Sequence, residues 1–255
     1  MQGNIHHAPL ENPRRILDVG CGTGYVTKQL GRKYPDAEVV GVDLSKVPSN
    51  GEVPPNVRFV QGDIKELMFN PDGSSGNAIR PGGFDYIFSR LLIAVPMDWQ
   101  EHIARLTTLL APEGWIELHD LEGIRYNDRS GPQASAPKLW EELVRDCEKV
   151  NIHCCIGRYL TEYLSDQEGL EKVQGQRYKW LWAQDETYPQ GAPLCHVQMQ
   201  QMPMIVAHLL QASSAKLRSP EDYEEFRRKI MEYVNTQAEP GEYMPFYAAW
   251  ARKQS

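Results

Sequence analysis

Several features that would have placed this chain in a class at once are missing from its sequence. No stretch approaches the roughly 20 apolar residues that a membrane-spanning helix needs. The first residues carry neither the basic charge nor the apolar run of a secretory leader. Lys and Arg (27) are fewer than Asp and Glu (34), and the formal net charge of −7 argues against a general affinity for nucleic-acid backbones. We therefore expect a cytoplasmic protein, with the nucleus as a second location, that binds neither membranes nor nucleic acids.

Cysteine is scarce and irregularly placed. The five cysteines are an odd number, two of them are adjacent, and none has the C-x-x-C spacing. This pattern fits neither a disulfide framework nor a zinc site, so no metal is expected. The 255 residues, 41% of them hydrophobic, are enough for one sizeable α/β domain.

The most informative segment that is present covers residues 16–24 and reads ILDVGCGTG. Its short apolar run, which ends in Asp18, fits a buried parallel strand. Gly20, Gly22 and Gly24 follow at alternate positions, and glycine allows a sharp turn and a close approach of the backbone to a ligand. A helical pattern begins directly afterwards. Strand, glycine turn and helix together predict a nucleotide-type cradle.

The spacing of the glycines excludes two common nucleotide sites. A G-x-G-x-x-G dinucleotide fingerprint would need a glycine at position 25 or 27, where the sequence has Tyr25 and Thr27. A phosphate P-loop would need G-K-[ST], which is absent. The remaining form, D-x-G-x-G-x-G, resembles the class I S-adenosylmethionine methyltransferases. The alternative is a tight strand–helix turn that binds no ligand.

Further strands that end in acids agree with this resemblance. Residues 39–43 are predicted to form a second apolar strand, and Asp43 lies about twenty residues past the turn, where an acid usually binds ribose hydroxyls. A third strand is predicted at residues 57–64. There Asp63 can accept from an adenine amino group while Ile64 packs on the ring. Strands are also predicted at residues 84–89 and 115–120. The resemblance implies S-adenosylmethionine as cofactor, S-adenosylhomocysteine as product, and a cofactor site formed by Asp18, Gly20, Cys21, Gly22, Gly24, Asp43, Leu44, Gly62, Asp63, Ile64, Ser89 and Arg90.

A closer resemblance, to the fungal LaeA-like methyltransferases of secondary metabolism, rests on further motifs. These are NIHHAP at residues 4–9, FDYIFSR at 84–90, DW at 98–99, GWIELHD at 114–120 and YMPFY at 243–247. The resemblance covers nearly the whole chain. It implies a Rossmann-like α/β fold with a seven-stranded class I methyltransferase sheet.

We expect one domain over residues 1–255, with a cofactor-binding core at 14–122. Residues 123–255 are predicted to hold a helical cap and the last two strands, at 170–180 and 246–251. Helices are expected to begin at Asp98 and Pro137, with another over residues 159–164 that Gly169 stops. A polar, glycine-rich loop is expected at residues 70–83. The helices of residues 185–238 would be inserted between the last two strands and form a lid over the carboxyl edge of the sheet.

His119 is the candidate general base, because an ordinary imidazole pKa near 6.5 suits proton removal at neutral pH. A core histidine is the alternative. Asp120 is expected to orient His119 or to shape the pocket. His6 and His7 either lie at the surface or fold over the cofactor, and Arg90 either pairs with the methionine carboxylate or is a plain surface residue.

The predicted function is methyl transfer to an oxygen or nitrogen atom of a small molecule. Met, Trp and Tyr residues between positions 180 and 210 suit an aromatic or apolar acceptor. Two rivals remain open. One is a LaeA-like regulator that binds S-adenosylmethionine but works through protein partners. The other is an enzyme that uses the same cofactor for a non-methylating reaction such as a cyclisation.

Overall fold

The computed structural model describes residues 5–48, 51–69, 79–127, 131–132, 144–181 and 241–255, with scattered positions between 219 and 232. Most of the predicted lid, including its Met-rich helix, lies outside these residues, and so do residues 70–78 of the predicted loop. No helix in the described part of the chain is long and apolar enough to cross a membrane.

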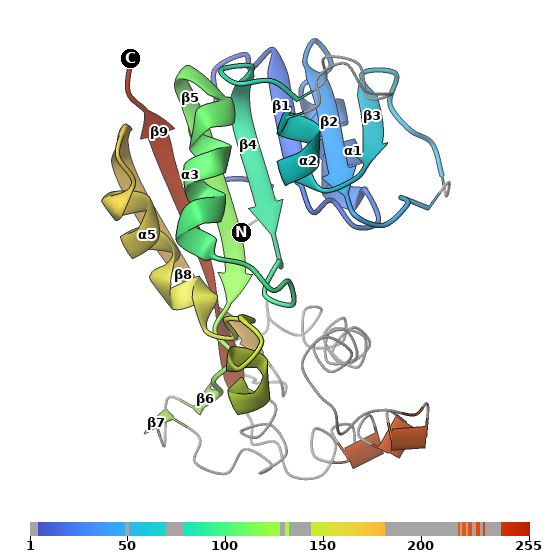
Figure 1. The fold of residues 1–255 in the computed structure, drawn as a ribbon, viewed down its shortest axis with the longest axis vertical. Coiled ribbons are helices and arrows are strands. Elements are labelled where there is room, and N and C mark those ends of the chain that lie inside the picture. Colours follow the sequence, from blue (N-terminus) through green and yellow to red (C-terminus); the bar gives the residue numbers. More distant parts are fainter. Residues whose placement is uncertain are drawn as a thin grey trace.

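The described residues form one mixed sheet (Figure 1). Its centre is parallel and runs in the order β3-β2-β1-β4-β5, and the antiparallel strand β9 then pairs with β5 on one side and β8 on the other. The strands are β1 (Arg15–Val19), β2 (Glu38–Asp43), β3 (Val57–Gln61), β4 (Phe84–Arg90), β5 (Leu110–Leu121), β6 (Tyr126–Asn127), β7 (Gly131–Pro132), β8 (Leu170–Leu181) and β9 (Tyr243–Lys253).

This architecture confirms the predicted Rossmann-like α/β class. Among the described residues, seven strands have five residues or more, and β9 runs antiparallel to its neighbours. The two-residue strands β6 and β7, which pair with each other, were not expected. The third strand is shorter than predicted. It ends at Gln61, because Gly62 turns away (φ 155°) and the Asp63 carboxylate accepts from the Lys65 N–H at 2.9 Å, which starts helix α2 (Ile64–Phe69).

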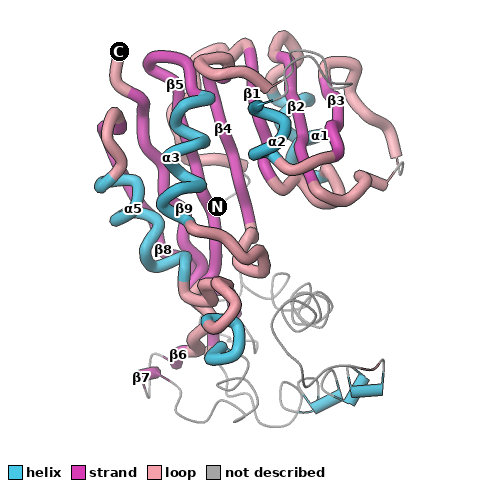
Figure 2. The backbone as a smooth tube through the Cα atoms, in the orientation of Figure 1, coloured by secondary structure: helices cyan, strands magenta, loops and turns pink. Residues whose placement is uncertain are grey.

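Helices cover both faces of the sheet (Figures 1 and 2). Helix α3 (Trp99–Leu109) and helix α5 (Leu160–Asp166), which follows the 3₁₀ turn η1 (Ile156–Tyr159), pack on one face, and α1 (Tyr25–Lys33) packs on the other.

Asp98 caps α3 as predicted, because its side chain accepts from the Glu101 N–H. The predicted helix at residues 159–164 is confirmed by η1 and α5, and Gly169 follows with φ 83°. Residues 144–148 are the described part of the helix predicted from Pro137.

Strand β5 carries the predicted catalytic residues His119 and Asp120. It begins at Leu110, directly after α3 and five residues earlier than predicted, and the pairing with β4 shifts between Phe84 and Tyr86. Residues 111–114 form an irregular stretch within the strand, where Glu113 has φ 66°. From Trp115 on the ladder is regular, so alternate side chains point to opposite faces of the sheet.

Candidate active site

The glycine turn between β1 and α1 has the sharply turned backbone that its sequence predicts. Gly20, Gly22 and Gly24 have φ values of 70°, 54° and 72°, a region that glycine adopts without steric cost. A Cβ on Gly20 would lie 2.2 Å from Cδ2 of Leu92, and one on Gly24 would lie 2.6 Å from Phe59. A Cβ on Gly22 would meet nothing within 4 Å. Two of the glycines therefore allow tight packing, and the third faces open space where a ligand can approach the backbone.

Asp43, at the end of β2, ties this turn to the sheet. Its Oδ2 accepts from the Gly22 N–H at 2.7 Å, and its Oδ1 accepts from the Ser45 N–H at 2.8 Å. The N–H groups of Gly20 and Cys21 both donate to the carbonyl oxygen of Val42. The turn is thus held by its own hydrogen bonds, with the carboxylate of Asp43 at its open side.

Asp18 and Cys21 lie beneath the turn. The Thr27 hydroxyl donates to Oδ2 of Asp18 at 2.6 Å, and burial raises the pKa of this carboxyl to about 6 although that hydrogen bond and the nearby Arg90 lower it. Burial, with Asp18 and Asp43 close by, also raises the pKa of the Cys21 thiol to about 12. Such a thiol stays protonated and unreactive at neutral pH. Both side chains therefore support the turn from inside.

Apolar side chains flank the open side of the turn. Leu44 is 62% exposed and Tyr25 is 64% exposed. Ile64, in contrast, is buried in the hydrophobic core and offers little of its side chain to a ligand. Asp63 lies between Gly62 and α2, where one of its oxygens caps the helix.

The same edge of the sheet continues from the turn to His119. Val19 of β1 is level with Ser89 of β4, and Ser89 is level with Leu118 of β5. One residue further, Arg90 is paired with His119. Because neighbouring strands lie about 4.8 Å apart, β5 runs about 10 Å from β1. His119 therefore lies at the level of the glycine turn, two strands along the carboxyl edge.

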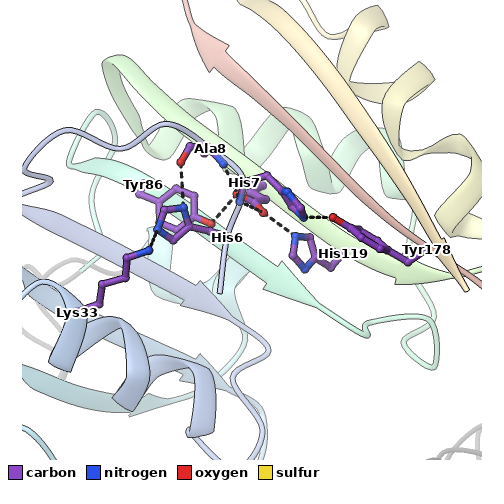
Figure 3. Close-up of polar contacts among 8 residues, drawn as sticks. His6, His7, Ala8, Lys33, Tyr86, His119 and Tyr178 are labelled. Atoms are coloured by element: carbon purple, nitrogen blue, oxygen red, sulfur yellow. Dashed lines mark hydrogen bonds and ion pairs between the residues drawn. The ribbon is translucent and has the colours of Figure 1, made fainter. Parts of the chain in front are cut away.

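Glu117 forms the centre of a hydrogen-bond network on the α1 face of the sheet. Its partners His7, Ala8, Tyr86 and His119 are labelled in Figure 3. The N–H of His7 donates to both carboxylate oxygens, at 2.8 and 3.0 Å, and the N–H of Ala8 donates to Oε2 at 2.9 Å. The hydroxyl of Tyr86 also donates to Oε2, at 3.0 Å. The contact from Nε2 of His119 to Oε1 measures 2.6 Å. This buried carboxylate joins β4, β5 and the N-terminal segment.

His6 and His7 are part of this network and do not lie at the surface as isolated residues. His7 stacks on Trp250 at a centroid distance of 4.8 Å, and the Tyr178 hydroxyl lies 3.1 Å from its Nε2. His6 is buried, with its Nε2 2.6 Å from the hydroxyl of Tyr34. The segment is thereby fixed to α1 on one side and to β8 and β9 on the other (Figure 3).

His119 is buried beside this cluster. The rings of Phe88 and Phe246 meet it edge-on, at 4.9 and 5.7 Å. Its Nδ1 is buried and has no hydrogen-bond partner within the described part of the chain. The prediction that Asp120 orients His119 is wrong. Successive residues of a strand point to opposite faces, and the carboxylate that contacts His119 is that of Glu117.

Asp120 lies on the opposite face, among the residues that pack against α3 and α5. Its Oδ1 accepts from the Leu121 N–H at 2.8 Å, and its Oδ2 is buried without a partner in the described residues. Burial raises the pKa of this carboxyl to about 7, although backbone N–H groups of Leu121, Leu92 and Ile93 pull it down. Its predicted role in shaping a pocket stays a prediction.

A metal ion could in principle be held by His7, Glu117 and His119, whose candidate ligand atoms lie within 4.8 Å of one another. The 2.6 Å contact between Glu117 and His119 is a hydrogen-bond distance, and an ion placed between the two atoms would force them apart. Both carboxylate oxygens already accept from other donors. The arrangement fits a hydrogen-bonded pair better than a metal centre.

The sequence matches a family model described as a methyltransferase domain over residues 1–175. The chain belongs to this methyltransferase family. The assignment confirms the resemblance to methyltransferases that the glycine motif indicated.

Several named relatives of this methyltransferase domain come from fungi. Methyltransferase str2 of Strobilurus tenacellus is 27% identical over 64% of this chain and 56% of its own length. Secondary metabolism regulator laeA of Coprinopsis cinerea is 36% identical over 66% of this chain and 41% of its own length. The chain spans about half the length of the curated relatives it matches.

Among solved structures, phosphoethanolamine N-methyltransferase 2 of Haemonchus contortus is similar, with a TM-score of 0.58 at 16% identity. The match covers 97% of this chain and 50% of that one, and that structure was solved with phosphomonomethylethanolamine and S-adenosylhomocysteine. At this identity the likeness supports the methyltransferase fold.

Two groups of residues in this methyltransferase domain differ in how well the sequence located them. The structure gathers Gly20 to Gly24 and Asp43 around one turn, and places Ser89, Arg90 and His119 along the same edge. Sequence reasoning missed Glu117, Tyr86 and Tyr178. The signal for Glu117 was present, because residues two apart on a strand share a face.

Proposed function

We propose that this methyltransferase domain transfers a methyl group from S-adenosylmethionine to an oxygen or nitrogen atom of a small aromatic or apolar molecule, in the cytoplasm or the nucleus. The observation that carries the proposal is the glycine turn, where Gly22 faces open space beside the carboxylate of Asp43. An acid at the end of the second strand is the usual partner of ribose hydroxyls in such folds.

The residues around the turn fit this cofactor. Asp43 would bind the ribose, and the exposed side chains of Leu44 and Tyr25 would cover apolar parts of the nucleoside. Asp63 would accept from the adenine amino group, and Arg90 would pair with the methionine carboxylate. When bound, the cofactor supplies a methyl group on a positively charged sulfur.

The protein's own contribution would be to orient the acceptor and to remove its proton. Holding an acceptor atom in line with the methyl group and excluding water can supply much of the rate. His119 lies at the carboxyl edge about two strand spacings from the turn, a place that suits a small acceptor held beside the donor. Histidine is the side chain that most often removes protons at neutral pH.

Two considerations favour a small apolar acceptor. The net charge of −7 opposes binding to nucleic acids, and aromatic rings such as Phe88, Phe246 and Trp180 gather near His119. The 36% identity to a secondary metabolism regulator keeps a regulatory role, through a protein acceptor or partner, as the second candidate.

Calorimetry tests the cofactor site. Replacing Asp43 by Ala should weaken S-adenosylmethionine binding about 5- to 150-fold, which corresponds to about 1–3 kcal/mol for hydrogen bonds to a charged group. Asp36→Ala is the matched control, because Asp36 is an exposed acid in the turn before β2, and it should bind normally. Unchanged affinity in Asp43→Ala would contradict the assignment.

Label transfer tests the acceptor. Methyl-labelled S-adenosylmethionine is incubated with the protein and, in parallel, with a fungal metabolite extract or a protein extract. We expect label in the small-molecule fraction. Label that enters only protein would support the regulatory candidate instead.

A further inference from the structure

The contact between Glu117 and His119 determines where the imidazole carries its proton. Burial alone would raise the pKa of Glu117, but the hydrogen bond and the electrostatic interaction with His119, together with hydrogen bonds from the N–H groups of Ala8 and His7, outweigh it and hold the pKa below its usual value. Glu117 is therefore ionised at neutral pH, and an ionised carboxylate can only accept hydrogen bonds. The hydrogen in the 2.6 Å contact must then belong to Nε2 of His119.

This tautomer leaves the other ring nitrogen of His119 as an acceptor. In a neutral imidazole only one nitrogen carries hydrogen, so Nδ1 has a free lone pair. Nδ1 is buried and has no partner within the described part of the chain. Leaving a buried polar atom unpaired is unfavourable, because the atom has lost its water and gained no partner. A hydroxyl or amine of a bound acceptor would satisfy it.

We propose that Glu117 is a positioning residue that holds His119 as the Nε2-protonated tautomer, so that Nδ1 takes the acceptor's proton during methyl transfer. The inference rests on the proposed function. The acceptor oxygen or nitrogen gains the methyl carbon and loses its proton to Nδ1. The electron pair of the broken carbon–sulfur bond stays on sulfur. The resulting imidazolium lies against the carboxylate of Glu117, which stabilises its charge.

The N-terminal segment is part of this arrangement. The backbone N–H groups of His7 and Ala8 supply hydrogen bonds that keep Glu117 ionised. The segment is itself held in place by the stacking of His7 on Trp250 and by the burial of Ala8. Docking of residues 6–8 therefore completes the Glu117–His119 pair.

The geometry predicts the outcome of replacing Glu117 by Gln. Three donors meet Oε2, from His7, Ala8 and Tyr86, so the oxygen of a glutamine amide would take that position. Its NH₂ group would then take the position of Oε1 and face Nε2 of His119. Because an amide NH₂ donates, Nε2 would become an acceptor and the proton of the imidazole would move to Nδ1.

Nitrogen-15 NMR of the imidazole rings tests this directly and needs no acceptor. The full chain is saturated with S-adenosylhomocysteine, and the signals of His119 are assigned by their loss in His119→Gln. We expect a protonated Nε2 and an unprotonated Nδ1 in the wild type, and the reverse in Glu117→Gln. Tyr86→Phe removes a different hydrogen bond of the same carboxylate and should keep the wild-type tautomer. A protonated Nδ1 in the neutral wild-type ring, or an unchanged tautomer in Glu117→Gln, would overturn the proposal.

Turnover gives the second readout, with the fraction that takes label in the acceptor experiment as substrate. Glu117→Gln should lower kcat about 10²- to 10⁴-fold, the usual contribution of a positioned base, with S-adenosylmethionine affinity unchanged. Glu113→Gln, an exposed acid on the same strand, is the control and should keep its activity. Wild-type turnover in Glu117→Gln would refute the role of Glu117. A wild type that transfers no label to any fraction would refute the proposed function, while the tautomer measurement would still decide the role of Glu117.

Discussion

Glu117 and Asp120 are two buried carboxyl groups on the same strand, three residues apart and on opposite faces of the sheet. Both are almost completely enclosed, at 0% and 1% exposure. Yet the pKa of Glu117 lies below its usual value, and that of Asp120 is raised to about 7. Burial is the same, so the difference must come from what surrounds each carboxylate.

The hydrogen bonds account for the difference. Both oxygens of Glu117 accept hydrogen bonds, and His119 adds a favourable electrostatic interaction to its hydrogen bond. Asp120 has only backbone donors, and its Oδ2 has no partner among the described residues. Donors favour the charged form of a carboxyl and desolvation opposes it. The surroundings of Glu117 therefore stabilise a buried negative charge, and those of Asp120 do not.

The largest expected effect comes from removing the better-bonded carboxylate. Glu117→Ala leaves the donors of His7, Ala8 and Tyr86 without an acceptor and opens a cavity beneath the N-terminal segment. Removing one partner of a buried, hydrogen-bonded charge costs about 3–5 kcal/mol. Urea unfolding at pH 7 should show a loss of that size. Glu113→Ala, at an exposed position of the same strand, should change the free energy of unfolding by less than about 0.5 kcal/mol. Similar losses in the two variants would contradict the comparison.

The effect of Asp120→Asn on stability should depend on pH, because the variant lacks a carboxyl group that resists ionisation. The pKa of Asp120 is raised in the folded protein, so its favourable contribution is complete below the unfolded pKa near 3.8 and is lost as the pH rises towards 7. Over this window the stability of the wild type relative to Asp120→Asn should fall by about 1.4 kcal/mol per pH unit. Urea unfolding of both proteins between pH 4 and pH 8 measures it. A difference independent of pH would mean that Asp120 is ionised in the folded state.

The two halves of the site also differ in how far the sequence could predict them. The turn from Gly20 to Gly24 and its partner Asp43 were found because their roles are local. Glycine spacing sets the backbone, and the end of the next strand brings an acid to the same edge. The two-residue period of strand β5 would also have shown that Glu117, and not Asp120, shares a face with His119.

What the sequence could not show is the set of donors around Glu117. They come from His7, Ala8 and Tyr86, which are 110, 109 and 31 residues away along the chain. Only the folded sheet and the docked N-terminal segment bring them together. The charge state of a buried group depends on such long-range partners, and a short sequence motif does not specify them.

Tyr86→Phe sharpens the comparison with a smaller change, because it removes one donor from Glu117 and moves it towards the state of Asp120. The lost hydrogen bond from the Tyr86 hydroxyl should cost about 1–2 kcal/mol at pH 7. Glu117 has a lowered pKa in the folded protein, so its contribution is present above the unfolded value near 4.5 and is lost as the pH falls through the folded pKa. With one donor fewer, the folded pKa of Glu117 should lie higher, and the variant should begin to lose stability at a higher pH than the wild type during acid unfolding.

Tyr178→Phe is the matched control, because the Tyr178 hydroxyl contacts His7 and not the carboxylate. It should unfold over the same pH range as the wild type. If acid unfolding of Tyr86→Phe and Tyr178→Phe moved to higher pH by the same amount, the ionisation of Glu117 would not depend on its direct donors.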